Sequence, residues 1–213
     1  MHTNPTTRIL CYWDSLTRGR IPNEKTRYSN DERRTWVMQL WLWWSFEIIE
    51  EWVRWRYTNF ENDQVRWRNW LPYFFPCILS HLPIDILILF LWTNNTQTQC
   101  GDTPEEILAS FELYKADLEA ACKEFQMSVP KVVLVSPPYI DSGLLDEDSK
   151  FDAVSELTSK ILGEHYKKFA EKNNRLFFDA ASVVWYGVID GIHLSKEQNL
   201  LLGEAMATFI KSI

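Results

Sequence analysis

Three side chains in this sequence have the types needed for acyl transfer. Ser15 follows a short apolar run, and Asp190 stands three residues before His193 near the other end of the chain. Acyl transfer at neutral pH needs a nucleophile, a base that takes its proton, and a carboxylate that orients and stabilises the base. Ser15, His193 and Asp190 supply one of each. A close Asp and His can lie on one rigid turn, which leaves the imidazole free to reach a serine at the end of the first strand.

Each of these residues also has an ordinary structural interpretation. A serine after a strand is usually a turn residue or a helix cap. His193, followed by Leu-Ser, could simply pack at the start of a helix, and Asp190 is a common turn former. It is the combination of the three that favours catalysis.

Four arginines lie near Ser15 in the sequence. Their guanidinium groups could bind an anionic acyl or phosphate group. Charged residues of this kind more often form a solvated face, and that is what we expect of Arg18, Arg20, Arg33 and Arg34.

The hydropathy pattern predicts the elements that must position these residues. Continuous apolar runs predict strands covered on both faces, and segments with helical spacing lie between them. This alternation predicts an α/β fold, with a parallel sheet between two layers of helices. The predicted strands are 8–12, 46–50, 84–91, 131–136 and 176–179, and the predicted helices are 35–44, 69–82, 103–125, 152–171 and 196–213.

Ligands bind at the carboxyl ends of the strands in such sheets, near the point at which strand order reverses. The residues that follow the predicted strands should therefore contain the chemistry. They are Asp14 and Ser15, then 51–59, 93–95 and 137–139.

The residues at these positions resemble the SGNH (GDSL-type) hydrolase family. Residues 9–17 (ILCYWDSLT) are similar to its GDSL block, 92–95 (WTNN) to its GTND block, and 190–193 (DGIH) to its DxxH block. The order of the blocks fits, and the resemblance covers nearly the whole chain. It is closest to the arylesterase and acyltransferase branch, through 48–51 (IIEE), Cys77 with 81–83 (HLP), 136–138 (SPP) and 177–180 (FFDA).

This resemblance implies a three-layer α/β/α fold with a flavodoxin-like, five-stranded parallel sheet. It also implies a serine esterase for short-chain aryl or alkyl carboxylic esters, in a branch whose members can transfer the acyl group to an alcohol or to hydrogen peroxide. Ser15 would be the nucleophile, His193 the general base and then acid, and Asp190 its partner. The oxyanion hole would be formed by the backbone N–H groups of Ser15 and Trp55 and by the Asn94 side-chain amide. The resemblance implies no cofactor and no metal.

Tryptophan stands at several positions where this family has glycine. The chain has 11 tryptophans and only 7 glycines. Glycine at such positions permits a positive φ or a close backbone approach, which tryptophan cannot offer without strain. Indoles in a packed interior also predict overpacking. The glycine positions are those of Trp13, Trp36, Trp43, Trp52, Trp70 and Trp92, while Trp55 replaces a small residue and Asn95 replaces an aspartate.

Three interpretations of the tryptophans remain open. In the first, the loops have adapted, and Trp13, Asp14 and Trp92 line an aromatic-walled acyl pocket. In the second, the chain keeps the triad but has become a binding module for a ligand or partner, without turnover. In the third, a codon that the source organism reads as glycine, as UGA is in some bacterial codes, has been translated as tryptophan. UGG codons at positions 13, 52 and 92 would exclude the third.

Composition limits the partners and the compartment. A chain of 213 residues supports a single domain over 1–213. Its net charge of −7 disfavours nucleic acid and anionic membranes as partners. The resemblance implies a small-molecule ester as the partner. The N-terminus has no signal-peptide pattern, and the four cysteines form no CxxC pair, so we expect reduced thiols and a cytoplasmic protein. Relatives in this branch form homo-oligomers, and exposed tryptophans would suit such an interface.

Overall fold

The computed structural model describes residues 6–52, 56–59, 68–91, 93–100 and 102–213, without the side chain of Trp13. Three predicted site features therefore lie outside the described residues: Trp55, Trp92 and the indole of Trp13. No helix in the described ranges combines the length and the apolar character that crossing a bilayer requires.

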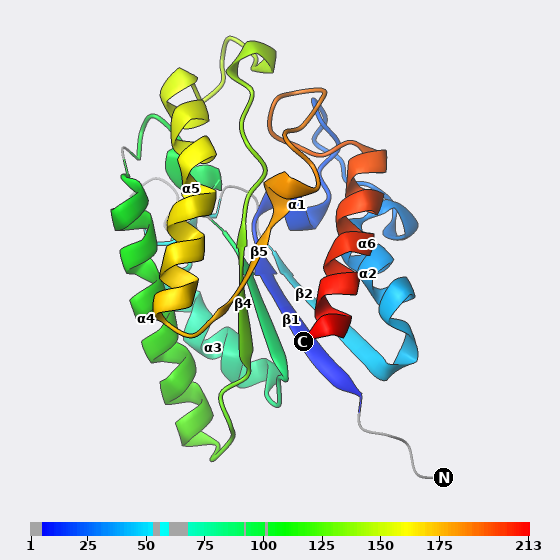
Figure 1. Ribbon diagram of the computed structural model, residues 1–213, viewed down its shortest axis with the longest axis vertical. Coiled ribbons are helices and arrows are strands. Elements are labelled where there is room, and N and C mark those ends of the chain that lie inside the picture. Colours follow the sequence, from blue (N-terminus) through cyan, green and yellow to red (C-terminus); the bar gives the residue numbers. More distant parts are fainter. Residues whose placement is uncertain (1–5, 53–55, 60–67, 92, 101) are drawn as a thin grey trace.

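The centre of the fold is a five-stranded parallel sheet in the order β2-β1-β3-β4-β5 (Figure 1). This is the flavodoxin-like order, and it confirms the predicted three-layer α/β/α fold. The inner strands β3 and β4 are almost wholly buried, as continuous apolar runs predict, whereas β2 and β5 lie at the edges and are only partly covered. The strands are β1 (Thr7–Trp13), β2 (Phe46–Trp52), β3 (Ile86–Phe90), β4 (Lys131–Ser136) and β5 (Leu176–Asp179).

Helices cover both faces of the sheet. In Figure 1, α2 and α6 lie on one side of the sheet, and α3, α4 and α5 lie on the other. Local capping sets where several of them begin: Thr103, Asp152 and Ser195 each accept a backbone N–H of the first turn that follows. The helices are α1 (Ser15–Arg18), α2 (Arg34–Leu42), α3 (Leu71–His81), α4 (Pro104–Glu124), α5 (Ala153–Lys172) and α6 (Lys196–Ser212).

Two local features differ from the sequence prediction. The short helix α1 was not predicted, because four residues carry no helical periodicity. The helix expected over 35–44 ends at Leu42, because Trp43 has φ 61° and ψ −170°, a conformation that does not continue a helix. These angles fall in a region used almost only by glycine.

Among the tryptophans at family-glycine positions whose side chains the structure describes, all but Trp70 lie outside the core, so the predicted overpacking applies to Trp70 alone. Trp36 and Trp43 are exposed, and Trp52 is half-buried at the end of β2. Trp70 is the buried member of the described set, and the guanidinium of the buried Arg56 lies over its indole. Among the described tryptophans, we therefore expect the free-energy cost to come from the packing of Trp70 in the core and from the backbone conformation of Trp43.

The topology places two polar segments side by side. Strands β1 and β3 are adjacent in the sheet although β2 comes between them in the sequence, so strand order reverses here. Trp13 pairs with Phe90, which means that β1 and β3 end at the same level. Asp14 and Ser15 follow β1, and a 3-10 turn, Thr93–Thr96, follows β3. This edge of the sheet is where a ligand site is expected.

Candidate active site

Ser15 is held at the first position of α1. The Asp14 side chain caps this helix by accepting the backbone N–H of Leu16 at 2.9 Å. The first N–H groups of a helix have no acceptor within the helix, so the Ser15 N–H is oriented to donate to a group outside it. The sharp turn after α1 is made by Gly19, which has φ 67°.

Asp14 is not a wall of the pocket, contrary to the sequence prediction. Its exposed fraction is 0%, and burial raises the pKa of its carboxyl above the ordinary value, against the lowering effect of the Leu16 N–H. Asp14 lies beneath Ser15 because its capping bond turns it inward. It is a positioning residue for the serine.

A compact turn holds Asp190 and His193 together. One oxygen of Asp190 accepts the backbone N–H groups of Ile192 and His193, at 3.0 and 2.7 Å, and the other lies 2.7 Å from Nδ1 of His193. Gly191 makes this turn possible, since it has φ 74° and a Cβ there would collide with the carbonyl oxygen of Asp141. The spacing D-G-I-H is thus the spacing of one closed turn.

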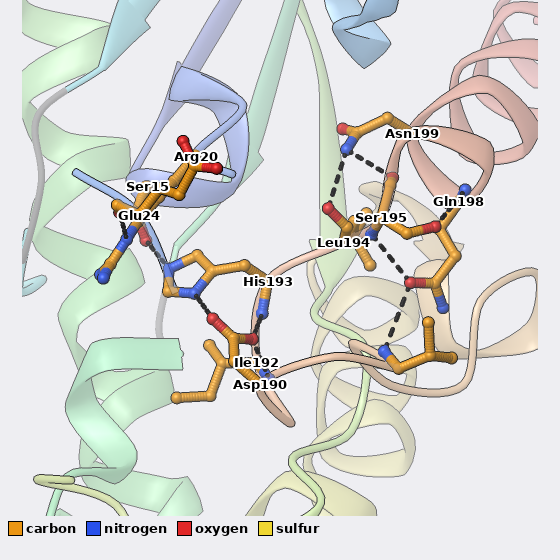
Figure 2. Close-up of polar contacts among 11 residues, drawn as sticks. Ser15, Arg20, Glu24, Asp190, Ile192, His193, Leu194, Ser195, Gln198 and Asn199 are labelled. Carbon is orange, nitrogen blue, oxygen red and sulfur yellow. Dashed lines mark hydrogen bonds and ion pairs between the residues drawn. The ribbon is translucent and has the colours of Figure 1, made fainter. Parts of the chain in front are cut away.

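The structure brings Ser15, His193 and Asp190 together in a line (Figure 2). Nε2 of His193 lies 3.2 Å from Oγ of Ser15. The carboxylate of Asp190 can only accept, so Nδ1 of His193 carries the proton and Nε2 is left as an acceptor for the Ser15 hydroxyl. This is the tautomer that a general base needs.

Asp190 stays ionised at this position. Burial alone would raise its pKa, but the hydrogen bond from the His193 ring, the charge of His193 and the backbone N–H groups of His193 and Ile192 outweigh burial. Together they lower the pKa to about 2. The group beside the imidazole is therefore a carboxylate throughout the neutral range.

The start of α6 anchors this turn from behind. Ser195 caps α6, and Oε1 of Gln198 accepts the Ser195 N–H at 3.0 Å. Nδ2 of Asn199 donates to the carbonyls of Leu194 and Ser195 at 3.3 and 2.9 Å (Figure 2). The imidazole therefore projects from a segment that is fixed at both ends.

Asn94 lies at the end of β3 and lines the same cleft as Ser15. Its Nδ2 donates to the Arg56 carbonyl at 3.1 Å and to the Asp14 carboxyl at a longer 3.4 Å. Its Oδ1 accepts from Gln97 at 3.1 Å, which fixes the direction of the amide. The amide group therefore faces Asp14, which precedes Ser15, and the backbone of Arg56.

Asn95 takes part in a different set of contacts. Its Nδ2 donates to Asp102 at 2.7 Å and to the Thr58 hydroxyl at 3.1 Å, and its Oδ1 accepts the Thr58 N–H at 3.2 Å. The aspartate that the family pattern has at this position would face the Asp102 carboxylate. With asparagine at position 95, the side chain donates a hydrogen bond to Asp102, and repulsion between two carboxylates is avoided.

A cleft of about 250 Å³ opens over these residues. Ser15, Asn94, Asp190 and His193 are among the residues that line it. The other walls, which the sequence did not identify, are polar side chains of the segment after α1 and of the loop before α5. They are Arg20, Asn23, Asp146, Asp148, Ser149 and Lys150, with Leu145, Phe151 and Ile192. The signal in the sequence for this loop was the polar run at 146–150, which lies between a predicted strand (131–136) and a predicted helix (152–171).

Two of the four arginines near Ser15 in the sequence are not on a solvated face. Arg33 and Arg34 are buried, and Arg34 donates to the Thr17 hydroxyl at 3.1 Å beneath α1. Burial lowers the pKa of Arg34 to about 9, against the opposite effects of Cys11, Asp14 and Glu50. Arg34 therefore supports α1 from below, and only Arg20 of the four lines the cleft.

Several solved structures are similar to this protein over almost the whole chain. A carbohydrate acetylesterase from Sinorhizobium meliloti shares 31% identity over 97% of this chain and 99% of its own, with a TM-score of 0.91. An aryl esterase from M. smegmatis shares 31% identity over the same fractions, with a TM-score of 0.89. A protein of the lipolytic G-D-S-L family from Veillonella parvula shares the fold at 14% identity, over 97% and 100%, with a TM-score of 0.65. No protein-family model and no curated protein sequence matches the chain.

Proposed function

Because this chain belongs to the SGNH (GDSL-type) hydrolase family and is a carboxylic ester hydrolase, we propose that it cleaves short-chain esters through an acyl-enzyme on Ser15. The observation that carries the proposal is the line of contacts from Ser15 Oγ to His193 Nε2 at 3.2 Å and from His193 Nδ1 to Asp190 at 2.7 Å. A nucleophile, a base and an orienting carboxylate are within hydrogen-bond reach of one another.

The first half of the reaction forms the acyl-enzyme. His193 takes the Ser15 proton on Nε2 while Oγ attacks the ester carbonyl carbon. The imidazolium that forms is stabilised by the ionised Asp190. When the tetrahedral intermediate collapses, the bond to the leaving alkoxide breaks and His193 returns the proton to it. In the second half, His193 deprotonates a water that attacks the acyl carbon. The bond between that carbon and Ser15 Oγ then breaks, His193 returns the proton to Oγ, and the acid leaves.

The oxyanion hole is part of the proposal. Ser15 and Asn94, which would supply two of the donors, both line the cleft, and the third proposed donor, the N–H of Trp55, lies outside the described residues. The 3.4 Å bond from Asn94 to Asp14 is the weaker of the two that its Nδ2 makes. A developing oxyanion would replace it at little cost, because charge-assisted bonds are the stronger ones.

The dimensions and lining of the cleft support a small ester with a polar alcohol part. A volume of about 250 Å³ is below the roughly 300–1,000 Å³ of most ligand pockets. Asn23, Asp148 and Lys150 offer hydrogen bonds beside the apolar side chains of Leu145, Phe151 and Ile192. We therefore propose acetyl or similarly short acyl groups, on alcohols that carry further hydroxyl groups.

Acyl transfer is the second part of the proposal. His193 is 6% exposed and Asp190 is 9% exposed, so the base and its carboxylate are shielded from bulk water, while Ser15 opens into the cleft. An alcohol or hydrogen peroxide bound by the polar cleft would then compete with water for the acyl group. The ratio of new ester to free acid, measured with increasing concentrations of a small alcohol, tests this part.

We propose that the protein works in a reducing compartment and that it forms homo-oligomers. Cys11, Cys77 and Cys122 are buried free thiols, which suits the cytoplasm.

Four exposed tryptophans, Trp36, Trp41, Trp43 and Trp44, gather on α2 and the turn after it, where a second copy could cover them. Light scattering of the purified chain measures its oligomeric state.

Turnover of p-nitrophenyl acetate by the purified chain and by Ser15→Ala tests the main proposal. We expect the variant to retain the melting temperature of the parent and to lose at least about 10⁴-fold in kcat, since removal of a nucleophile leaves only binding and the oxyanion hole. Equal rates for the two proteins would refute the assignment of Ser15. A parent chain that binds the ester without turnover would favour the binding-module interpretation.

A further inference from the structure

Three side chains with metal-ligating atoms meet between β2 and α3, apart from the proposed active site. Glu51 comes from the end of β2, and Cys77 and His81 come from one face of α3, four residues apart. Their carboxylate, thiol and imidazole atoms all lie within 4.8 Å of one another. The family resemblance had drawn attention to these residues, but the ester chemistry uses none of them.

The cluster is open to solvent on one side, and the Tyr73 hydroxyl donates to Glu51 at 3.4 Å. Nε2 of His81 lies 2.7 Å from Glu51, and Cys77 is buried behind them. The side chains of His81 and Glu51 are 23% and 21% exposed, so solvent reaches the open side. The backbone at His81 is fixed, because Arg8 donates to its carbonyl at 2.6 Å.

The donor set selects among metal ions. A thiolate with an imidazole and a carboxylate is a typical set for zinc, whereas Mg²⁺ and Ca²⁺ prefer oxygen ligands alone. Zinc bonds of roughly 2.0–2.3 Å place tetrahedral ligand atoms roughly 3.3–3.7 Å apart. The present separations, from 2.7 Å to below 4.8 Å, bracket that spacing, so small side-chain rotations suffice.

We propose that Glu51, Cys77 and His81 bind one zinc ion, with water as the fourth ligand. The ion replaces the thiol proton of Cys77, which passes to solvent, and it replaces the short contact between His81 and Glu51 by two metal bonds. Three protein ligands and one water constitute an open tetrahedral site.

The site links α3 to the loop beside the proposed active site. The Glu51 carbonyl accepts from Arg56 at 2.9 Å, and the Arg56 carbonyl accepts from Asn94 at 3.1 Å. A zinc ion on Glu51 would therefore fix the end of β2, from which this chain of contacts extends to Asn94. We assign the ion a structural role, because the cluster does not reach Ser15.

Zinc binding by the full chain tests the proposal without an ester substrate. The purified, chelator-treated chain is titrated with Zn²⁺, and with Co²⁺ to detect the absorption of a metal–thiolate bond. We expect one ion per chain. At 100-fold excess over Kd, binding should raise the melting temperature by about 5–10 °C.

Variants of the ligands and matched controls locate the site. Cys77→Ser and His81→Gln should each weaken binding by at least about 100-fold, because loss of even an outer-shell partner costs roughly 10–100-fold. Cys122→Ser and His165→Gln remove a buried cysteine and a partly exposed histidine elsewhere and should bind as the parent does. If Cys77→Ser does not fold, the partly exposed His81 still provides the decisive variant.

Three results would overturn the proposal: no zinc bound at micromolar concentrations, unchanged binding in His81→Gln and Cys77→Ser, or loss of binding only in the control variants. The proposal is independent of the ester chemistry, since Ser15→Ala should bind zinc as tightly as the parent chain.

Discussion

Nε2 of His193 lies 3.2 Å from Oγ of Ser15, although 178 positions separate the two residues in the sequence. The parallel sheet ends β1 beneath the cleft, and the turn before α6 carries the imidazole over the same edge. Each partner is fixed by a local device, the Asp14 cap for Ser15 and the Gly191 turn for His193. The contact between Ser15 and His193 thus depends on two short loops, so a single substitution in either loop can disrupt it.

Asp190→Asn should lower kcat for p-nitrophenyl acetate by about 10²–10⁴-fold. The amide can donate to Nδ1 of His193, which favours the tautomer whose Nε2 carries the proton and cannot accept from Ser15. KM should change much less, because the proposed role of Asp190 is in the chemical steps. Asp117→Asn, on α4 and not in the lining of the cleft, is the matched control and should keep kcat within a few-fold of the parent. A similar kcat loss in both variants would contradict a special role for Asp190.

The contact between Asp190 and His193 should make the free energy of unfolding fall at acidic pH. The pKa of Asp190 is about 2 in the folded chain and about 3.9 in an unfolded one, so the carboxylate stabilises the fold above pH 4. That stabilisation is lost as the pH falls from about 4 to 2. Discounted for the part of the carboxyl that water reaches, it amounts to about 1–2 kcal/mol. Urea unfolding from pH 5 to pH 2 should show a steeper loss for the parent than for Asp190→Asn, and parallel curves would refute this assignment.

Asn94→Ala should lower kcat by about 10²–10³-fold with little change in KM, because an oxyanion donor acts mainly in the transition state. The next residue provides the comparison. Asn95→Asp would place a carboxylate against Asp102, now 2.7 Å from Nδ2 of Asn95, and should lower the melting temperature more than kcat. If Asn94→Ala changed only the melting temperature, Asn94 would be a structural residue of the turn after β3.

The sequence alone predicted the regular strands and the capped starts of helices. β4 and β5 have the predicted bounds, because a strand in a parallel sheet is a continuous apolar run with polar residues after it. The capping motifs at Thr103 and Ser195 placed the starts of α4 and α6 in the same way. The spacing of Asp190 and His193 was also readable, since both belong to one turn.

Other parts of the site were not readable because they depend on distant contacts. The burial of Asp14 and Arg34 beneath α1 follows from how β1, α1 and α2 pack, and no local pattern distinguishes such residues from solvated ones. The cleft wall from Asp146 to Lys150 is brought to Ser15 by the loop before α5. The pairing of Asn95 with Asp102 likewise depends on how the chain returns to the turn after β3.

The backbone at Trp43 bears on the origin of the tryptophans. Its angles, φ 61° and ψ −170°, are those of a glycine, at a position where the family has glycine. This agreement favours the decoding interpretation over loop adaptation. It predicts UGA codons at position 43 and at positions 13, 52 and 92, and the gene sequence is the measurement. UGG at these positions would exclude it.

Trp43→Gly should stabilise the chain. Release of the backbone strain gains about 1–3 kcal/mol, and the added freedom of glycine in the unfolded state costs about 0.5–1 kcal/mol. Little burial is lost, since Trp43 is 62% exposed, so the melting temperature should rise by a few degrees. Trp44→Gly is the matched control: Trp44 is 84% exposed, does not have a positive φ, and loses the same ring contact between Trp43 and Trp44. It has no strain to release and should be neutral or slightly destabilising. Equal melting temperatures for the two variants would mean that Trp43 carries no strain.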